Sequence, residues 1–567
     1  MMAGKVGEAT AAVEALDLGV LLAGIRDEGV RNAVVRLTNL LEQLAAEVRS
    51  LLEANQRLQD ENNRLKGQSP RPTGKGGKGG KGAGKGQDYS SEKERQTPKT
   101  WSKGSKIDQI IIDREQKVPV DRALLPADAV FKGYVPVVVQ DVKVTTDNVR
   151  FLKEKWYSAS EGRTYLADLP AGYAGEFGPG VGTLVPVLYF GLGTSEPKIV
   201  EFLRYVGVSI SDGQVSDMLI KDQEPFHEEA AAVREAGLGS SPWQHLDTTA
   251  TRVNGEAQHC HVLANPLYSG YDTRPAKDRL TVIDVLRGGQ DRRFVLNDEA
   301  MGYLARMGLS LKRRNEVGQL PWHEPMDLAT LEQQLGEKVP SLGPTQRRWV
   351  LDALAVAAYH AQTDYPVVRM LVCDDAPAFN WVTDDLALCW IHEGRHYAKL
   401  GAVLRLHCEL LDDFGTRFWA YYRALAAYRE APSEADRQRL ETEFEVLFTT
   451  ETDFWPLNER IALTYAKKEQ LLAVLEHPEV PLHNNPAELA VRRRVRKRDV
   501  SFGPRTAEGA KAWDTFQTLA ATAQKLNVSF FRYIQDRVSG AHQMPSLADL
   551  IRQRASVLDL GASWTVT

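Results

Sequence analysis

The sequence has few cysteines and no long apolar run. Its four cysteines (Cys260, Cys373, Cys389 and Cys408) form no C-x-x-C pair, which argues against a disulfide framework or a zinc knuckle and favours a reducing compartment. No apolar stretch approaches the roughly 18 residues that span a bilayer, and the short one at 18–22 is flanked by acids, unlike a secretory signal. We therefore expect a cytoplasmic protein with no membrane partner.

The chain also lacks a net positive charge. Its 70 Lys and Arg residues and 75 Asp and Glu residues give a formal net charge of −5 at pH 7, which does not by itself indicate nucleic-acid binding. Binding depends instead on local basic stripes. The sequence contains two such stripes, one around Lys75, Lys78 and Lys81 and one at 492–498. Each stripe could touch DNA or could simply be solvated surface.

A leucine repeat dominates the N-terminal segment, 1–66. Leucine recurs every seven residues, and the positions three before the last four leucines are Leu41, Val48, Asn55 and Asn62; the leucines are Leu37, Leu44, Leu51, Leu58 and Leu65. This heptad predicts a coiled coil that joins copies of the chain into a homo-oligomer. The alternative is one amphipathic helix packed on its own domain. Residues 67–106 are rich in Gly and Lys and predict a flexible basic linker.

Two further modules are expected before the central domain. Strand-like patterns at Val135–Val144 and Thr164–Leu166 predict a small β-rich module over 107–170. Over 171–235, a helical pattern at 197–206, a glycine-containing turn and a Ser-capped second helix running to Met218 predict a helical region that resembles a DNA-binding helix-turn-helix. Any αα-hairpin would have the same pattern.

The remaining chain predicts a mixed α/β domain. Strand patterns occur at about 243–253, 256–265 and 279–286, with Asn254-Gly255 as a hairpin turn. A helical segment at 291–365, a fourth strand at 367–373 and further helices follow. Three antiparallel strands, a crossover, another strand and a late helix match a ribonuclease-H-like sheet. We therefore expect a multidomain α/β protein with a catalytic domain at 236–290 and 366–540, a helical insertion at 291–365 and a C-terminal tail at 541–567.

Three carboxylates lie where a metal-dependent phosphoryl-transfer site would need them. Asp247 is on the first strand, Asp374 ends the fourth, and Glu488 is on a late helix. Such sites bring carboxylates together on two Mg²⁺ or Mn²⁺ ions. Asp374 or the adjacent Asp375 could be the second ligand, or either could simply begin a loop. Glu488 could instead be a capping-box acid at the third helical position, with Asn485 as N-cap.

Basic side chains occur on both sides of Glu488 in the sequence. We expect the cations of the run at 492–498 to lie along DNA phosphates, and Arg395 to neutralise a phosphate near the site; the run comprises Arg492, Arg493, Arg494, Arg496, Lys497 and Arg498. The histidines between Cys389 and Cys408 fit no familiar zinc spacing and are interpreted as structural.

Three strings carry a family resemblance. Asn484-Asn485-Pro486-Ala487-Glu488 with the basic residues before Phe502, the string Cys389-Trp390-Ile391-His392-Glu393-Gly394-Arg395, and Gly207–Ser211 resemble segments of insertion-sequence-66 family transposases. The resemblance implies a catalytic triad of Asp247, Asp374 and Glu488 that binds two Mg²⁺ or Mn²⁺ ions. It also implies double-stranded DNA as partner, small accessory proteins from the same element, and a bacterial cytoplasm with its nucleoid as location.

The sequence departs from that family at several positions. Residues 107–170 contain no cysteine, so no structural zinc is expected. The first two acids are 127 positions apart, longer than usual, and Asp375 stands where the family has glycine. The expected function is a transposase that cleaves element ends and joins them to target DNA. A non-catalytic DNA-binding regulator and a structure-specific nuclease on the same fold are the alternatives.

Overall fold

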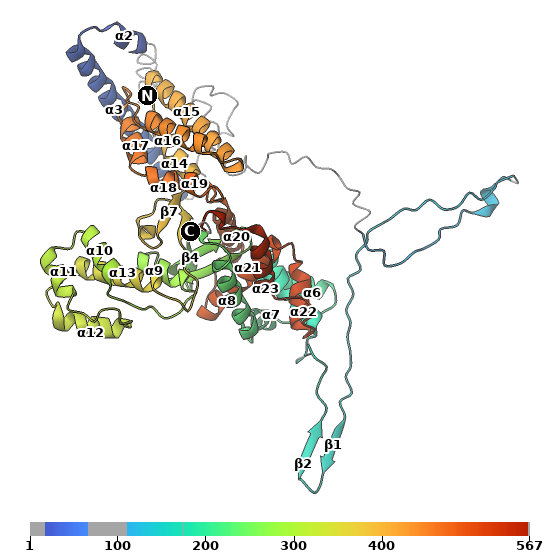
Figure 1. The fold of residues 1–567 in the computed structure, drawn as a ribbon. Coiled ribbons are helices and arrows are strands. Elements are labelled where there is room, and N and C mark those ends of the chain that lie inside the picture. The colour runs from blue at the N-terminus through green and yellow to red at the C-terminus, as the bar shows by residue number, and fades with distance from the viewer. Residues whose placement is uncertain (1–17, 66–109, 127, 174, 565–567) are drawn as a thin grey trace.

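The structure, a computed structural model, describes residues 18–65, 110–126, 128–173 and 175–564. The lysines predicted to hold DNA loosely, Lys75, Lys78 and Lys81, lie outside the described residues. A mixed sheet forms the centre of the molecule, and groups of helices surround it (Figure 1). No helix in the described part of the chain is both long and apolar enough to cross a membrane.

The central sheet has five strands in the order β5-β4-β3-β6-β7. The first three strands along the chain pair antiparallel, and β6 and β7 add to β3 in parallel. Asn254 and Gly255, both with positive φ, form the tight turn between β3 and β4. The strands are β3 (Trp243–Val253), β4 (Glu256–Ala264), β5 (Ser269–Arg274), β6 (Met370–Cys373) and β7 (Asp385–Leu388).

One predicted strand is wrong. Residues 279–286 form helix α9 (Arg279–Leu286), and the third strand is instead β5. The side chain of Asp278 accepts a hydrogen bond from the backbone N–H of Thr281 and caps the helix. A short apolar run does not distinguish a buried helix from a buried strand. The sequence reading also missed β7.

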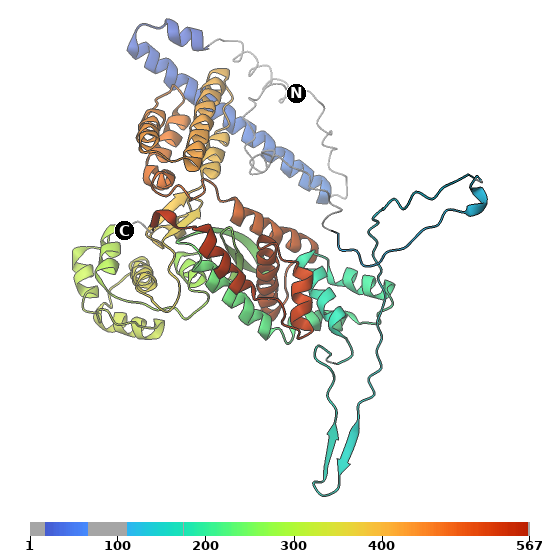
Figure 2. The ribbon, with the colours of Figure 1, turned by 45° about the vertical axis from the view of Figure 1, so that its right-hand side comes forward.

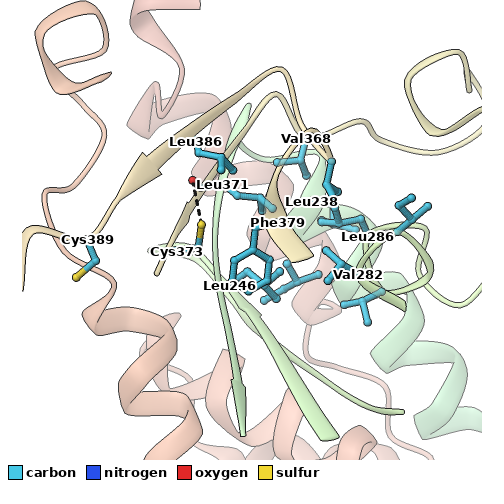
Figure 3. Close-up of a cluster of buried hydrophobic side chains, with 14 of the residues drawn as sticks. Leu238, Leu246, Val282, Leu286, Val368, Leu371, Cys373, Phe379, Leu386 and Cys389 are labelled. Atoms are coloured by element: carbon cyan, nitrogen blue, oxygen red, sulfur yellow. Dashed lines mark hydrogen bonds between the residues drawn. The ribbon is translucent and has the colours of Figure 1, made fainter. Parts of the chain in front are cut away.

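The two faces of the sheet carry different partners. One face packs Leu246 and Leu371 against Val282 and Leu286 of α9 and against Phe379 (Figure 3). The opposite face is covered by α20 (Asn485–Ser501) and α21 (Ala507–Lys525). Successive side chains of a strand point to opposite faces of the sheet. Since Leu246 points toward α9, the next residue, Asp247, points toward α20.

Helices form the other layers. α6 and α7 contact each other, and a capping box at Ser211 starts α7, so the two-helix pattern predicted there is confirmed. The predicted helical insertion is helical, although it begins earlier, at α9. The helices before and within the insertion are α5 (Pro179–Pro186), α6 (Glu196–Tyr205), α7 (Asp212–Ile220), α8 (Glu224–Leu238), α10 (Asp298–Arg306), α11 (Leu311–Val317), α12 (Leu328–Lys338) and α13 (Pro344–His360).

A second helical group follows β7 and lies apart from the α10–α13 group (Figure 2). It comprises α14 (Trp390–Ala398), α15 (Arg405–Glu430), α16 (Glu434–Phe448), α17 (Trp455–Tyr465), α18 (Lys468–Leu471) and α19 (Ala473–Glu476). After α20 and α21 come α22 (Phe530–Val538) and α23 (Leu547–Leu558). The segment predicted as a C-terminal tail therefore contains α23, whose buried residues pack against α8.

The segment predicted as a β-rich module has little regular structure. Its strands, β1 (Lys155–Ser158) and β2 (Arg163–Leu166), form one hairpin. The run Val135–Val144 forms no strand, and all its valines except Val138 are exposed. The expectation of a strand there is wrong: the alternating valines have no neighbouring strand to pair with in the described chain, and alternation alone supplies none.

The N-terminal helices are α2 (Leu18–Gly24) and α3 (Glu28–Leu65). α3 lies alongside the α14–α19 group (Figures 1 and 2). Asn39 exchanges hydrogen bonds with the backbone of Asp453 and Trp455, and Glu42 is buried among the N–H groups at 403–404 and His407. The heptad leucines 37, 44, 51 and 58 are exposed. The helix thus packs on its own chain with one face and presents the leucines on another.

Candidate active site

Asp247 lies in the middle of β3, beside the parallel strand β6. The strand register pairs His245 with Val372. Asp247 lies two residues further along β3, and Asp374 directly follows the last residue of β6. One Asp247 oxygen accepts a hydrogen bond of 2.7 Å from the backbone N–H of Thr248. The parallel pairing therefore brings the first two acids of the predicted triad to one place at the sheet.

The structure separates Asp374 from its neighbour Asp375. Asp374 is partly buried, accepts from the backbone N–H of Ala376 at 3.2 Å and acts electrostatically on Asp247. Asp375 is exposed and accepts a hydrogen bond of 2.6 Å from Lys467. Although burial alone would raise it, the bond from Lys467 lowers the pKa of Asp375. Asp374 is therefore the carboxylate that faces the other two acids.

Glu488 reaches the site from α20, which begins one residue earlier than predicted. Asn484, not Asn485, is the N-cap, so Glu488 occupies the fourth helical position and not the capping-box position. The side chain of Asn484 instead donates to the Leu246 carbonyl at 2.8 Å and lies 3.0 Å from Nδ1 of His245. These bonds tie the start of α20 to β3, directly beside Asp247.

Two residues of α14 surround the Glu488 carboxylate. Arg395 places Nη2 3.4 Å from Oε2 of Glu488 and Nη1 3.3 Å from Nε2 of His392. Nδ1 of His392 lies 3.6 Å from Oε1 of Glu488. Both of these last atoms are buried without a hydrogen-bond partner in the described chain. Glu488 is therefore a buried acid with one unsatisfied oxygen, a costly state that a bound cation would relieve.

The electrostatics of Asp247 connect the three acids. Burial, together with the charges of Asp374 and Glu488, raises the pKa of Asp247 to about 7, while the Thr248 N–H and Arg395 oppose the change. Like charges that share one site disfavour ionisation unless a cation neutralises them. The crowding therefore fits a site for divalent cations, which would be held by Asp247, Asp374 and Glu488.

Two tighter groups of ligand-type side chains lie nearby. In each, the ligand atoms fall within 4.8 Å of one another: Cys389, His392 and Glu488 form one group, and Asp375, Glu393 and His396 the other. In the second group, Glu393 is already paired with Arg460 and Lys467. In the first group, Sγ of Cys389 accepts from the Asn484 N–H at 3.3 Å, and burial raises the pKa of Cys389 to about 11. The three triad acids do not form so tight a group.

Comparison with known proteins identifies this region. Residues 357–512 match the family model described as "Transposase IS66 family". This segment is therefore similar to IS66-family transposases. The match confirms the resemblance drawn from the motifs, and it includes Asp374, Arg395 and Glu488, whereas Asp247 precedes it. A protein of Sinorhizobium fredii (strain NBRC 101917 / NGR234), "Uncharacterized protein y4jO", is 29% identical over 328 residues, which cover 56% of this chain and 99% of that protein.

The basic run at 492–498 is divided between surface and interior. Arg494 is 1% exposed and paired with Asp514, so the expectation that it contacts DNA is wrong. The same holds for Lys497, which is 3% exposed, donates to the Thr194 carbonyl and lies over the ring of Tyr189. Burial lowers the pKa of Lys497 to about 7. Every residue of the run is cationic or valine, so no apolar periodicity could mark the inward positions.

The rest of the basic run keeps part of its surface. Arg496 is exposed, while Arg492, Arg493 and Arg498 are partly buried. Arg493 donates to Gln524 at 2.6 Å, and Arg498 donates to the Ala250 carbonyl. Arg395, the predicted phosphate-neutralising residue, contacts Glu488. Asn484 and His392 are site residues that the sequence does not single out, because Asn484 stands within a longer motif and the spacing of His392 fits no metal site.

Proposed function

We propose that this IS66-family protein is a DNA transposase that cleaves the ends of a mobile element and joins them to target DNA. The observation that carries the proposal is the mutual action of Asp247, Asp374 and Glu488, which arrive from two strands and a helix. The strand order β5-β4-β3-β6-β7, with a late helix carrying the third acid, supports a ribonuclease-H-like catalytic domain.

The three carboxylates would hold two Mg²⁺ or Mn²⁺ ions. Bound there, the ions would supply Lewis-acid activation of the attacking oxygen and neutralise the leaving oxygen. The protein's own contribution is positional. Asn484 fixes the start of α20 against β3. Arg395, which also contacts His392, holds the orientation of the Glu488 side chain. A phosphate entering the site would compete with Glu488 for the Arg395 guanidinium.

DNA is the partner that the transposase domain implies. We assign backbone contacts to the outward side chains of the basic run, namely Arg492, Arg493, Arg496 and Arg498, and looser contacts to the lysine-rich linker. The pair α6 and α7 is the candidate helix-turn-helix. Small accessory proteins from the same element and a nucleoid location belong to the same proposal.

The leucine face of α3 supports a homo-oligomer. Leu37, Leu44, Leu51 and Leu58 are each more than half exposed, while the opposite face of the same helix is fixed by Asn39 and Glu42. An apolar heptad seam in water is normally covered by a second helix. We propose that a second copy of the chain covers it, which would bring two active sites into one complex.

The test is divalent-ion-dependent cleavage and joining of DNA from the element's own ends, with any accessory proteins present. Wild type should cut and join, and Glu488→Gln should do neither while binding DNA equally well. Glu508→Gln, an exposed acid near the start of α21, is the matched control and should remain active. Cleavage without joining would favour the nuclease, and binding without cleavage by any variant would favour the DNA-binding regulator.

A further inference from the structure

An exposed aromatic ring stands at the C-terminal end of α20. Phe502 directly follows the last residue of the helix, and its side chain is 88% exposed. Its backbone is left-handed, with φ of 59°, a conformation that residues other than glycine, asparagine and aspartate rarely adopt. Folding alone does not account for a phenylalanine that is both strained and left in water.

The turn that carries this ring is braced by the β3–β4 hairpin. Gly503 also has positive φ, and a Cβ at this position would lie 2.7 Å from the Arg252 carbonyl oxygen. The backbone N–H of Asn254 donates to the Pro504 carbonyl at 3.0 Å. The N–H of Phe502 donates to the Arg498 carbonyl at 2.7 Å. The ring therefore stands on a fixed support and not on a loose loop.

The segment that carries the ring and the hairpin that braces it expose cations. Arg496, Arg505 and Arg252 are exposed, and Asp499 is the one acid between residues 489 and 505. Aromatic rings among cationic side chains are the surface that unpaired nucleic acid requires, because the cations follow the phosphates while each base stacks on a ring. Apolar wedges of this kind also enter between base steps of a duplex that is opened or kinked.

We propose that Phe502 is a stacking site for an unpaired nucleobase in the DNA that the protein processes. This inference rests on the proposed transposase function and adds a base-contacting residue to it. Glu488 lies near the start of α20, and Phe502 caps its end 14 positions later, or about 21 Å at 1.5 Å per residue. That length matches about six base-pair steps of 3.4 Å. With α20 aligned along the duplex, the ring would meet the DNA about six base pairs from the phosphate that is cut.

The experiment compares two DNA probes with the full-length protein in the absence of divalent ions. One probe is a closed duplex, and the other is the same duplex with two adjacent unpaired thymines, one replaced by 5-iodouracil. Wild type should bind the open probe about 5-fold to 150-fold more tightly, the range expected for one stacked base. Irradiation should crosslink the iodouracil to a peptide containing position 502.

Variants distinguish stacking from general DNA binding. Phe502→Ala should lose the preference for the open probe and the crosslink while keeping its affinity for the closed duplex. Phe502→Trp should keep both, and Val500→Ala, an exposed apolar neighbour, is the matched control. Arg496→Gln with Arg505→Gln should weaken both probes equally and lower the salt slope by about two.

Three outcomes would overturn the proposal. An unchanged preference in Phe502→Ala would refute stacking and leave the transposase function intact. A change in molecular mass of Phe502→Ala without a change in probe preference would make the ring a contact with a second copy of the chain. Failure of wild type to bind either probe would contradict the stacking site together with the proposed function.

Discussion

Replacing Asp247 by asparagine should stabilise the ion-free protein at neutral and alkaline pH. The folded carboxyl has a pKa of about 7, raised first by burial and then by Asp374 and Glu488, against about 3.9 for an unperturbed aspartate. That difference corresponds to roughly 4 kcal/mol at high pH. Asparagine cannot ionise, and its side-chain oxygen can still accept from the Thr248 N–H. The variant should therefore avoid the penalty while losing catalysis.

The destabilisation caused by the Asp247 carboxylate grows as the pH rises. Because the folded pKa is raised, the folded state binds the proton more tightly than the unfolded state, and stability falls as the pH rises from about 4 to about 7. Roughly 2.5 kcal/mol of the penalty should develop between pH 5 and pH 8. In thermal melts with a chelator, the Tm of the variant minus that of wild type should widen by several degrees over this interval. Added Mg²⁺ should raise the Tm of wild type and not that of Asp247→Asn.

A neighbouring acid provides a control of opposite sign. The pKa of Asp375 is lowered because the hydrogen bond from Lys467 outweighs burial, so its charge stabilises the folded state above the unfolded pKa and that stability is lost as the pH falls. Asp375→Asn should lower the Tm at pH 8. If Asp247→Asn and wild type differ by the same amount at pH 5 and pH 8, the raised pKa of Asp247 is refuted. If added Mg²⁺ leaves the Tm of wild type unchanged, the cation site is refuted.

Three further predictions concern the supports of the site and the N-terminal helix. Arg494→Ala should lower the free energy of urea unfolding by about 3–5 kcal/mol, because it breaks a largely buried ion pair and leaves Asp514 without its cationic partner. Arg496→Gln should change stability by less than about 0.5 kcal/mol and lower the DNA salt slope by about one; equal effects of the two substitutions on stability would refute the division of the run. Asn484→Ala should cost about 2–4 kcal/mol through two unsatisfied partners and should slow cleavage; full stability would contradict its role. Glu42→Ala should speed hydrogen exchange of the amides at 403–404. Leu44→Asp should lower the molecular mass measured by light scattering and leave the exchange of those amides unchanged.

The sequence predicted the elements that depend on local signals. The Asn254-Gly255 turn, the strands at 243–253 and 256–264, and the Ser211-capped helix are specified by residues next to one another. The predictions failed where pairing partners decide the structure. Residues 279–286 are apolar enough for a buried strand, yet a cap at Asp278 and burial against the sheet make them a helix. The valines at 135–144 alternate as in a strand and have no strand beside them.

The candidate site shows the same limit at the level of single side chains. The triad acids could be named from sequence because a metal-binding phosphoryl-transfer site requires carboxylates on particular elements. The side chains that support these acids could not be predicted, because their positions depend on contacts between distant segments. Asn484 contacts β3 across 238 positions of chain, and Arg395 reaches Glu488 across 93. The same reasoning applies to α20. Arg494 points inward because it pairs with Asp514 of α21, and no pattern within the run at 492–498 indicates that partner.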